Sequence, residues 1–162
     1  MLFNQTLDMV QFKVIIAGGR NYDDYTTLRK ECDRILSRKF ADSGCEVVIV
    51  SGGATGADAL GEQYASEKGL TIDRHPADWK KNGRAAGPIR NAEMADVSDA
   101  LIAFWDGQSR GTKSMIDLAK RKGLQVAVVR YDLMNEDDLK DLLHPLPNED
   151  EMDKILEEDD ID

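Results

Sequence analysis

The stretch CEVVIVSGGATGAD, residues 45–58, joins an unbroken apolar run to a glycine-rich turn and the start of a helix. Three other apolar runs have the length of strands, at residues 12–17, 100–105 and 124–130, and the more polar stretch 70–75 has the same length. Segments with apolar residues at helical spacing alternate with these runs, at residues 23–40, 57–68, 89–97 and 112–122. Continuously apolar strands are typical of parallel sheets that are covered by helices on both faces.

This alternation predicts an α/β fold, namely a Rossmann-like, three-layer, doubly wound parallel sheet with right-handed crossovers. We expect the strand order 3-2-1-4-5, with the more polar third strand at an edge. In such a sheet, ligands bind in the crevice outside the carboxyl ends of the strands, at the topological switch point. The loops after the first, second and fourth strands are therefore the places to look for a ligand site.

The loop after the first strand contains Gly18, Gly19 and Arg20. Glycines let a backbone turn sharply and approach a ligand, and the N-terminus of the following helix is a ready anion site. Arg20 can add a bidentate contact to a phosphate. The alternative is an ordinary strand-to-helix turn with an arginine that faces solvent.

The loop after the second strand, residues 51–56, has glycine at three of five successive positions, which is more than a turn requires. Thr55 and Asp58 also have the spacing of a capping box, with aspartate in place of the usual glutamate. One alternative is therefore that these two side chains only hold the start of the helix. Otherwise Asp58 joins a phosphate or ribose site with Ser51, Gly52, Gly53, Thr55 and Gly56.

The loop after the fourth strand runs from Asp106 into a helix and narrowly misses the P-loop pattern. The second glycine of that pattern would have to stand where the chain has Thr112, so a P-loop NTPase is not expected. The N-terminus of the helix can still bind an anion. We expect contacts from Gly111, Thr112 and Lys113.

Two further polar residues, Arg90 and Asn91, stand near the start of the helix that precedes the fourth strand. They can face the cleft, and the alternative is that they are solvated. Trp79 and Trp105 are interpreted as packing residues rather than as platforms for base stacking.

The acidic charge is concentrated at one end of the chain. Residues 132–162 hold 14 acidic residues against two lysines, a net charge of −12, and residues 1–131 carry +2, which together give the −10 of the whole chain. We expect a Rossmann-like nucleotide-derivative-binding domain at 1–131 and an acidic tail at 132–162. The tail is either solvated and partly disordered or forms short helices over 135–139 and 149–158. Neither part provides the basic surface that duplex DNA requires.

Several classes of protein are excluded. No apolar run reaches the roughly 20 residues of a membrane span, and the N-terminal residues lack the pattern of a secretory signal. Cys32 and Cys45 lack CxxC spacing, and two such thiols fit a reducing compartment. His75 and His144 have no second ligand at metal spacing. We expect a cytoplasmic protein with no metal, no cofactor and no membrane partner.

Taken together, SGGATGAD (51–58), PIRNAEMADVSDALIAFWDGQSRGT (88–112) and the later strand VAVV (126–129) resemble the SLOG superfamily. This group of Rossmann-like proteins joins the DNA-processing protein A family and the LOG cytokinin-activating phosphoribohydrolases. The opening VIIAGGRNYDDY (14–25) looks most like its YspA/cpYpsA-related branch of bacterial and phage proteins. The resemblance spans residues 12–130.

The resemblance implies a pocket for nucleoside phosphates, ADP-ribose-like molecules or cyclic nucleotide signals, built by the same three loops. LOG hydrolases carry PGGxGTxxE with a catalytic glutamate, and an arginine upstream. Here Gly111 and Thr112 match the GT and Arg90 matches the arginine, but the glutamate position is Met115. Asp117 does not substitute, because two residues along a helix rotate a side chain by about 200°. Hydrolysis by the LOG route is therefore not favoured.

Three functions remain open. The first is binding of a small phosphorylated nucleotide derivative by a sensor, carrier or sequestering protein, with the sugar held by Asp58, Arg90 or Asn91. The second is a nucleotide hydrolase that uses Asp58 or Asp106 as its acid/base. The third is single-stranded DNA binding, which the 6% aromatic content and the acidic tail disfavour, so a nucleic-acid partner is not expected. Homo-oligomerisation is left open.

Overall fold

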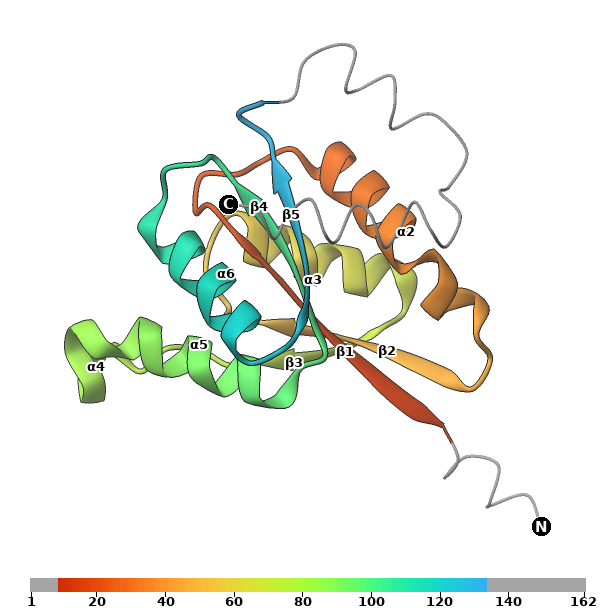
Figure 1. The fold of residues 1–162 in the computed structure, drawn as a ribbon, viewed down its shortest axis with the longest axis horizontal. Helices are drawn as coiled ribbons and strands as arrows, with labels where there is room; N and C mark the ends of the chain where they lie inside the picture. The colour runs from red at the N-terminus through yellow and green to blue at the C-terminus, as the bar shows by residue number, and fades with distance from the viewer. Residues whose placement is uncertain (1–8, 134–162) are drawn as a thin grey trace.

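A five-stranded, all-parallel sheet forms the centre of the molecule, in the order β3-β2-β1-β4-β5 (Figure 1). The computed structural model describes residues 9–133. Along the chain the elements are β1 (Val10–Gly18), α2 (Tyr25–Ala41), β2 (Cys45–Ser51), α3 (Ala57–Lys68), β3 (Thr71–Arg74), α4 (Trp79–Asn82), η1 (Gly83–Ala85), α5 (Ala86–Val97), β4 (Ala100–Trp105), α6 (Arg110–Arg121) and β5 (Gln125–Arg130). The predicted α/β fold and strand order are confirmed. The helices expected at 135–139 and 149–158 lie outside the described residues.

Helices cover both faces of the sheet because successive residues of a buried strand point to opposite sides. On one face Ile16 belongs to a buried cluster with Leu28 of α2 and Tyr64 of α3. On the other face Ile15 belongs to a cluster with Met94 of α5 and with residues of α6 (Figure 1). Each large apolar side chain buried in this way contributes about 1.5–3 kcal/mol. The three layers therefore follow from the unbroken apolar runs of the strands.

Short polar signals set the ends of the helices. The Asp24 carboxylate accepts a hydrogen bond from the Thr27 N–H at 3.1 Å and caps the N-terminus of α2. Gly69 ends α3 in the left-handed conformation with a φ of 70° and donates to the carbonyls of the last turn. The helix expected at residues 57–68 therefore has the bounds of α3.

The segment between β3 and β4 differs from the expectation. The helix expected at residues 89–97 begins earlier, at Ala86, and the stretch between β3 and this helix contains α4 and η1. Pro88 is the third residue of α5, where its missing N–H has no partner within the helix to lose. The proline therefore indicates the first turn of a helix here and not the end of a loop.

The two tryptophans have different environments. Trp105 is 7% exposed and packs in the core, so the prediction of a packing residue is confirmed for it. Trp79 is 52% exposed, so the same prediction is wrong for Trp79. The physical reason is that Trp79 opens the short helix α4, outside any element with an apolar face directed at the sheet. Across residues 9–133, no helix combines the length and the apolar character needed to cross a membrane.

Candidate functional site

A cleft of about 440 Å³ opens at the carboxyl ends of β1 and β4, which is the topological switch point of this sheet. The loops after β1, β2 and β4 all contribute to its wall, together with the first part of α5. Nine of the residues singled out in the sequence line it: Gly18, Gly19, Arg20, Asp58, Arg90, Asn91, Asp106, Gly111 and Thr112.

Direct backbone contacts join the three loops. The Gly19 carbonyl accepts a hydrogen bond from the Ala57 N–H at 3.1 Å, and the Gly19 N–H donates to the Phe104 carbonyl at 3.2 Å. The Thr55 hydroxyl donates to the Arg20 carbonyl at 3.3 Å. The loop after β1 is thus tied both to the start of α3 and to the end of β4, which fixes the shape of the cleft.

Glycines make these contacts possible. A Cβ on Gly56 would collide with the carbonyl oxygens of Gly19 and Arg20, and a Cβ on Gly18 would collide with the Phe104 carbonyl. Gly56 also has a φ of 78°, a conformation that favours glycine. At Gly18 the missing Cβ therefore makes room for the Phe104 carbonyl rather than for a ligand, although Gly18 itself lines the cleft. Gly111, in contrast, has nothing within 4 Å of an added Cβ and lies open to the cleft.

Arg90 and Asp58 form the polar floor of the cleft. Arg90 donates from Nη1 to the Gly52 carbonyl at 2.6 Å and from Nε to Asn91 Oδ1 at 2.9 Å. A Cβ on Gly52 would lie 2.5 Å from Arg90 Nη1 and 2.8 Å from Asp58 Oδ2, so a side chain at this position would displace one or both of these groups. The arginine is therefore held in place while its side chain still lines the cleft.

The Asp58 carboxylate is buried, with an exposed fraction of 6%. Burial raises the pKa of Asp58. The hydrogen bond that the carboxylate accepts from the Ala54 N–H at 3.2 Å and the nearby charge of Arg90 lower this pKa, but by less than burial raises it. The alternative role of Thr55 and Asp58 as a capping box does not hold. The N-cap of α3 is Gly56, which has no side chain to cap with, and the Thr55 hydroxyl bonds to Arg20 instead.

Asp106 has a different role from Asp58. Its Oδ1 accepts from the Gln108 N–H at 2.8 Å and the Ser109 N–H at 2.7 Å, which shapes the turn before α6. These two hydrogen bonds hold the pKa of Asp106 below its ordinary value, and the bond from the Ser109 N–H has the larger effect. Asp106 is therefore an ionised turn residue, and Asp58 is the stronger candidate for an acid.

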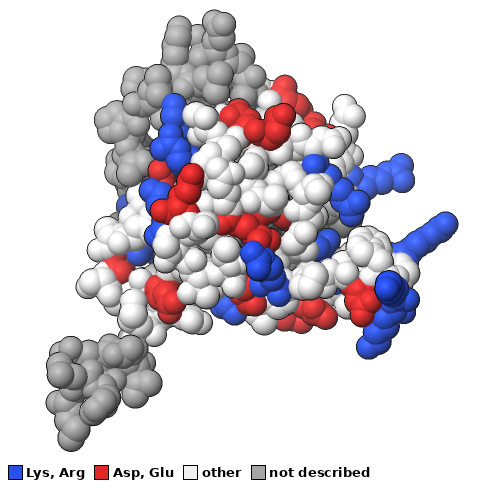
Figure 2. Space-filling view, turned by 180° about the vertical axis from the view of Figure 1, so that it is seen from behind, with Lys and Arg blue, Asp and Glu red and all other residues white. Residues whose placement is uncertain are grey.

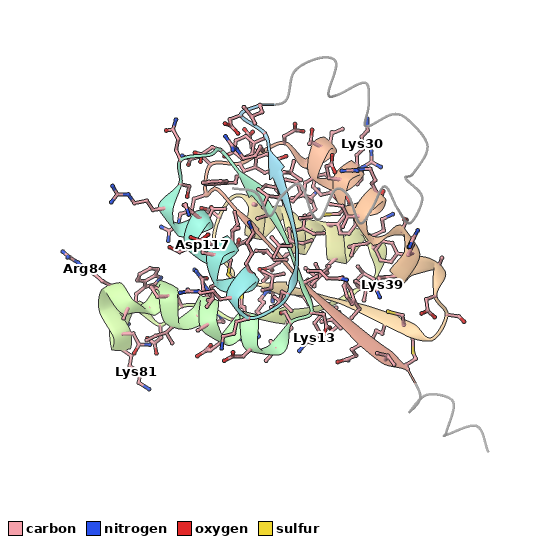
Figure 3. The ribbon with its side chains drawn as sticks, viewed as in Figure 1. Lys13, Lys30, Lys39, Lys81, Arg84 and Asp117 are labelled. Carbon is pink, nitrogen blue, oxygen red and sulfur yellow. The ribbon has the colours of Figure 1, made fainter. Side chains whose placement is uncertain are left out.

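The structure places the remaining predicted residues away from the main cleft. Gly52 and Gly53 line a smaller adjoining hollow. Ser51 is fully buried and donates to Glu62 at 2.7 Å. Lys113 pairs with Asp117 at 2.9 Å on the outer side of α6, where Figure 3 labels Asp117. Ser51 and Lys113 do not line the main cleft, and Thr55 and Gly56 do not line it either.

Sequence reasoning missed Tyr131 as a cleft residue. Tyr131 directly follows β5, so it lies at the same edge of the sheet as the three loops. An added Cβ on Gly19 would lie 2.9 Å from its hydroxyl. Its position after a predicted strand was the available signal. Met115, at the position of the LOG glutamate, also lines the cleft and is 2% exposed.

The described residues hold no group of three or more His, Cys, Asp or Glu side chains arranged for a metal ion. The wall of the cleft itself presents the two arginines, the Asp58 carboxyl and the start of α6, where the first amides have no partner within the helix.

We expect Asp58→Asn to be more stable than the wild type at pH 7. The pKa of Asp58 is raised in the folded state, so the proton it binds favours folding. This contribution to stability is fully present when the pH is below 3.8, the ordinary pKa of the group. It is lost as the pH rises through the raised pKa of the folded protein. Asparagine keeps an acceptor for the Ala54 N–H without the buried charge.

Urea unfolding of both proteins from pH 4 to pH 8 tests this expectation. The midpoint of Asp58→Asn should exceed that of the wild type at neutral pH, and the difference should shrink toward acid pH. A difference that instead grows toward acid pH would show that the folded protein does not raise the pKa of Asp58.

Fold and site together define a doubly wound α/β protein with a polar cleft, lined by Arg20 and Arg90, at its switch point. The sequence model of the YspA, cpYpsA-related SLOG family matches residues 12–82. The Gene 61 protein of Mycobacterium phage D29 is 34% identical over 120 residues, which cover 70% of this chain and 93% of that protein. The chain belongs to the YspA, cpYpsA-related SLOG family.

Solved structures share the fold. DNA processing protein A from Streptococcus pneumoniae superposes with a TM-score of 0.60 at 18% identity, covering 82% of this chain and 56% of that one. This chain thus spans little more than half of the pneumococcal protein. DNA processing protein A from Helicobacter pylori, described with a single-stranded DNA binding mode, superposes with a TM-score of 0.54 at 21% identity. The match covers 91% of this chain and 81% of that one. At these identities the likeness concerns the fold alone.

Proposed function

We propose that the cleft binds a small phosphorylated nucleotide derivative and that the protein senses, carries or sequesters this ligand in bacterial or phage nucleotide signalling. The observation that carries the proposal is the convergence of three loops, far apart in sequence, on one cleft that holds Arg20 and Arg90. Its volume of about 440 Å³ lies in the range of small-molecule sites.

The chemistry of the wall supports this ligand class. Arg20 and the N-terminal amides of α6 offer positive charge and hydrogen-bond donors to a phosphate. Asp58 and Asn91 offer acceptors to sugar hydroxyl groups, and Met94 and Met115 supply an apolar back wall. A phosphate at α6 and a sugar toward Asp58 would use both ends of the cleft.

Calorimetric titration with ADP-ribose, NAD, AMP and cyclic nucleotides tests the proposal. A matched pair of variants makes the test specific to the cleft. Gly111→Asp adds a carboxylate at an open position of the wall, in the first turn of α6, where an acidic residue is favourable for the helix. Gly111→Asn adds the same volume without charge.

We expect Gly111→Asp to bind about tenfold or more weakly than Gly111→Asn, because like charges repel at close range. Both variants should melt at or above the wild-type temperature, since a helical glycine is replaced by a residue with a smaller entropy cost. Equal affinities for the two variants, or no binding by the wild type across the panel, would refute the proposal.

A hydrolase is the second candidate, and the buried Asp58 carboxyl with its raised pKa favours it, because general acids often have this character. Incubation with nucleoside monophosphates followed by chromatography for the free base separates the two functions. Release that disappears in Asp58→Asn would assign an enzyme. The apolar Met115 supplies no carboxylate for the LOG route.

Single-stranded DNA is a third candidate. The exposed Trp79 is followed by Lys80, Lys81 and Arg84, and Figure 3 shows Lys81 and Arg84 extending away from the body of the molecule. Figure 2, however, shows Lys and Arg interspersed with Asp and Glu over the rear face rather than in one basic track. Retention on oligonucleotides that weakens steeply with salt would support this function.

A further inference from the structure

A second hollow of about 130 Å³ adjoins the main cleft. Both are lined by Arg20, Ala54 and Arg90, so the two arginines stand at their common boundary. The walls of the second hollow come from the loop after β2 and from the segment after β3 that leads into α4. A ligand that reached from the main cleft into this hollow would therefore contact both arginines.

Trp79 forms one side of the second hollow. The ring is 52% exposed, although burying an indole is among the more favourable contributions an apolar side chain can make. The backbone of Trp79 is held at the start of α4, where the Asp78 carboxylate accepts a hydrogen bond from the Lys81 N–H at 3.1 Å and caps the helix. The ring also lies beside α5, because a Cβ added to Gly87 would stand 3.6 Å from Cη2 of Trp79.

Arg20 lies over the Trp79 ring, with its Cζ 6.0 Å from the ring centroid. A planar base between the two groups needs about 7 Å, which is twice the optimal contact of about 3.5 Å between stacked atoms. Arg20 is exposed and has a long side chain, so a small outward movement provides this space. The same guanidinium can then stack on the base and reach the phosphate in the main cleft.

We propose that Trp79 is the stacking platform for the nucleobase of the ligand whose phosphate occupies the main cleft. This inference rests on the proposed function and deepens it, because it divides the ligand between two hollows. Gly52 and Gly53 also line this hollow and bear no side chain, which leaves more of its volume to a flat ring. Ligands with a base should therefore bind more tightly than the matching sugar phosphate.

The experiment compares AMP with ribose 5-phosphate, which lacks the base, by calorimetry on the wild type, Trp79→Ala and Trp79→Phe. Ile89→Ala is the control, because Ile89 is also exposed, at 41%, on nearby α5 and lines neither hollow. Both variant sites are exposed, so all four proteins should have similar circular dichroism spectra and melting temperatures.

We expect Trp79→Ala to weaken AMP binding about tenfold or more and to change ribose 5-phosphate binding less than twofold. Trp79→Phe should restore part of the loss, and Ile89→Ala should match the wild type. AMP should also quench the emission of the wild type, whose other tryptophan, Trp105, is buried. Trp79→Phe should show almost none of this quenching.

Two results would overturn the inference, and they can be told apart. In the first, the wild type binds AMP, but Trp79→Ala either binds AMP as tightly as the wild type or loses as much affinity for ribose 5-phosphate as for AMP. Trp79 is then not a stacking platform, while the proposed function stands. If the wild type binds neither compound nor any nucleotide of the larger panel, both proposals fail together.

Discussion

Gly56→Ala is expected to lower the free energy of unfolding by about 3–5 kcal/mol, because two costs add at this position. The φ of 78° and ψ of −130° belong to a region that only glycine enters easily, which costs an alanine about 1–3 kcal/mol. The new Cβ would also collide with the Gly19 and Arg20 carbonyls, and overpacking costs a further 1–3 kcal/mol or so. The loops after β1 and β2 would have to separate.

Two other glycines provide matched controls for this prediction. Gly53→Ala has a similar φ of 72° but nothing within 4 Å of the new methyl group, so it should lose only about 1–2 kcal/mol. Gly111→Ala has neither problem and should be neutral or slightly stabilising. Urea unfolding monitored by circular dichroism measures all three. A Gly56→Ala protein within about 1 kcal/mol of the wild type would mean that the loops separate at little cost.

The fold was predictable because the buried strands carry a strong signal. The run VVIV ahead of Ser51 and the run ALIAF at 100–104 are apolar without a break, which is how strands covered on both faces appear in sequence. Alternation with helical segments then allowed few topologies. The region around Pro88 was misread because a proline fits both a loop and the first turn of a helix.

The site was only partly predictable. Parallel strands bring their carboxyl ends to one edge, so the loops that meet there could be named without coordinates. The sequence could not tell a glycine that is needed for loop contact from one that lies open to the cleft. Gly56 and Gly111 look alike in sequence and differ only in the atoms that surround them. The exposure of Trp79 and the contact between Arg90 and the Gly52 carbonyl depend on tertiary placement that no local pattern encodes.

Arg90→Ala is expected to weaken nucleotide binding about 100-fold and to lower stability at pH 7 by about 2 kcal/mol, the usual worth of a hydrogen bond to a charged group. The change removes the bond to the Gly52 carbonyl and takes the nearest positive charge from the buried Asp58. Arg90→Lys should recover the charge but little of the affinity, because an ammonium cannot reproduce the directed contacts of Nε and Nη1.

The double variant Arg90→Ala with Asp58→Asn separates the two effects. Arg90 acts to lower the pKa of Asp58, so without the arginine that pKa rises further and the ionised carboxylate becomes more costly at neutral pH. Asp58→Asn should therefore restore part of the lost stability, whereas nucleotide affinity should stay low because the ligand still lacks its guanidinium partner. Restored affinity would mean that Arg90 acts only by neutralising Asp58, and unchanged stability would mean that the two groups are not coupled.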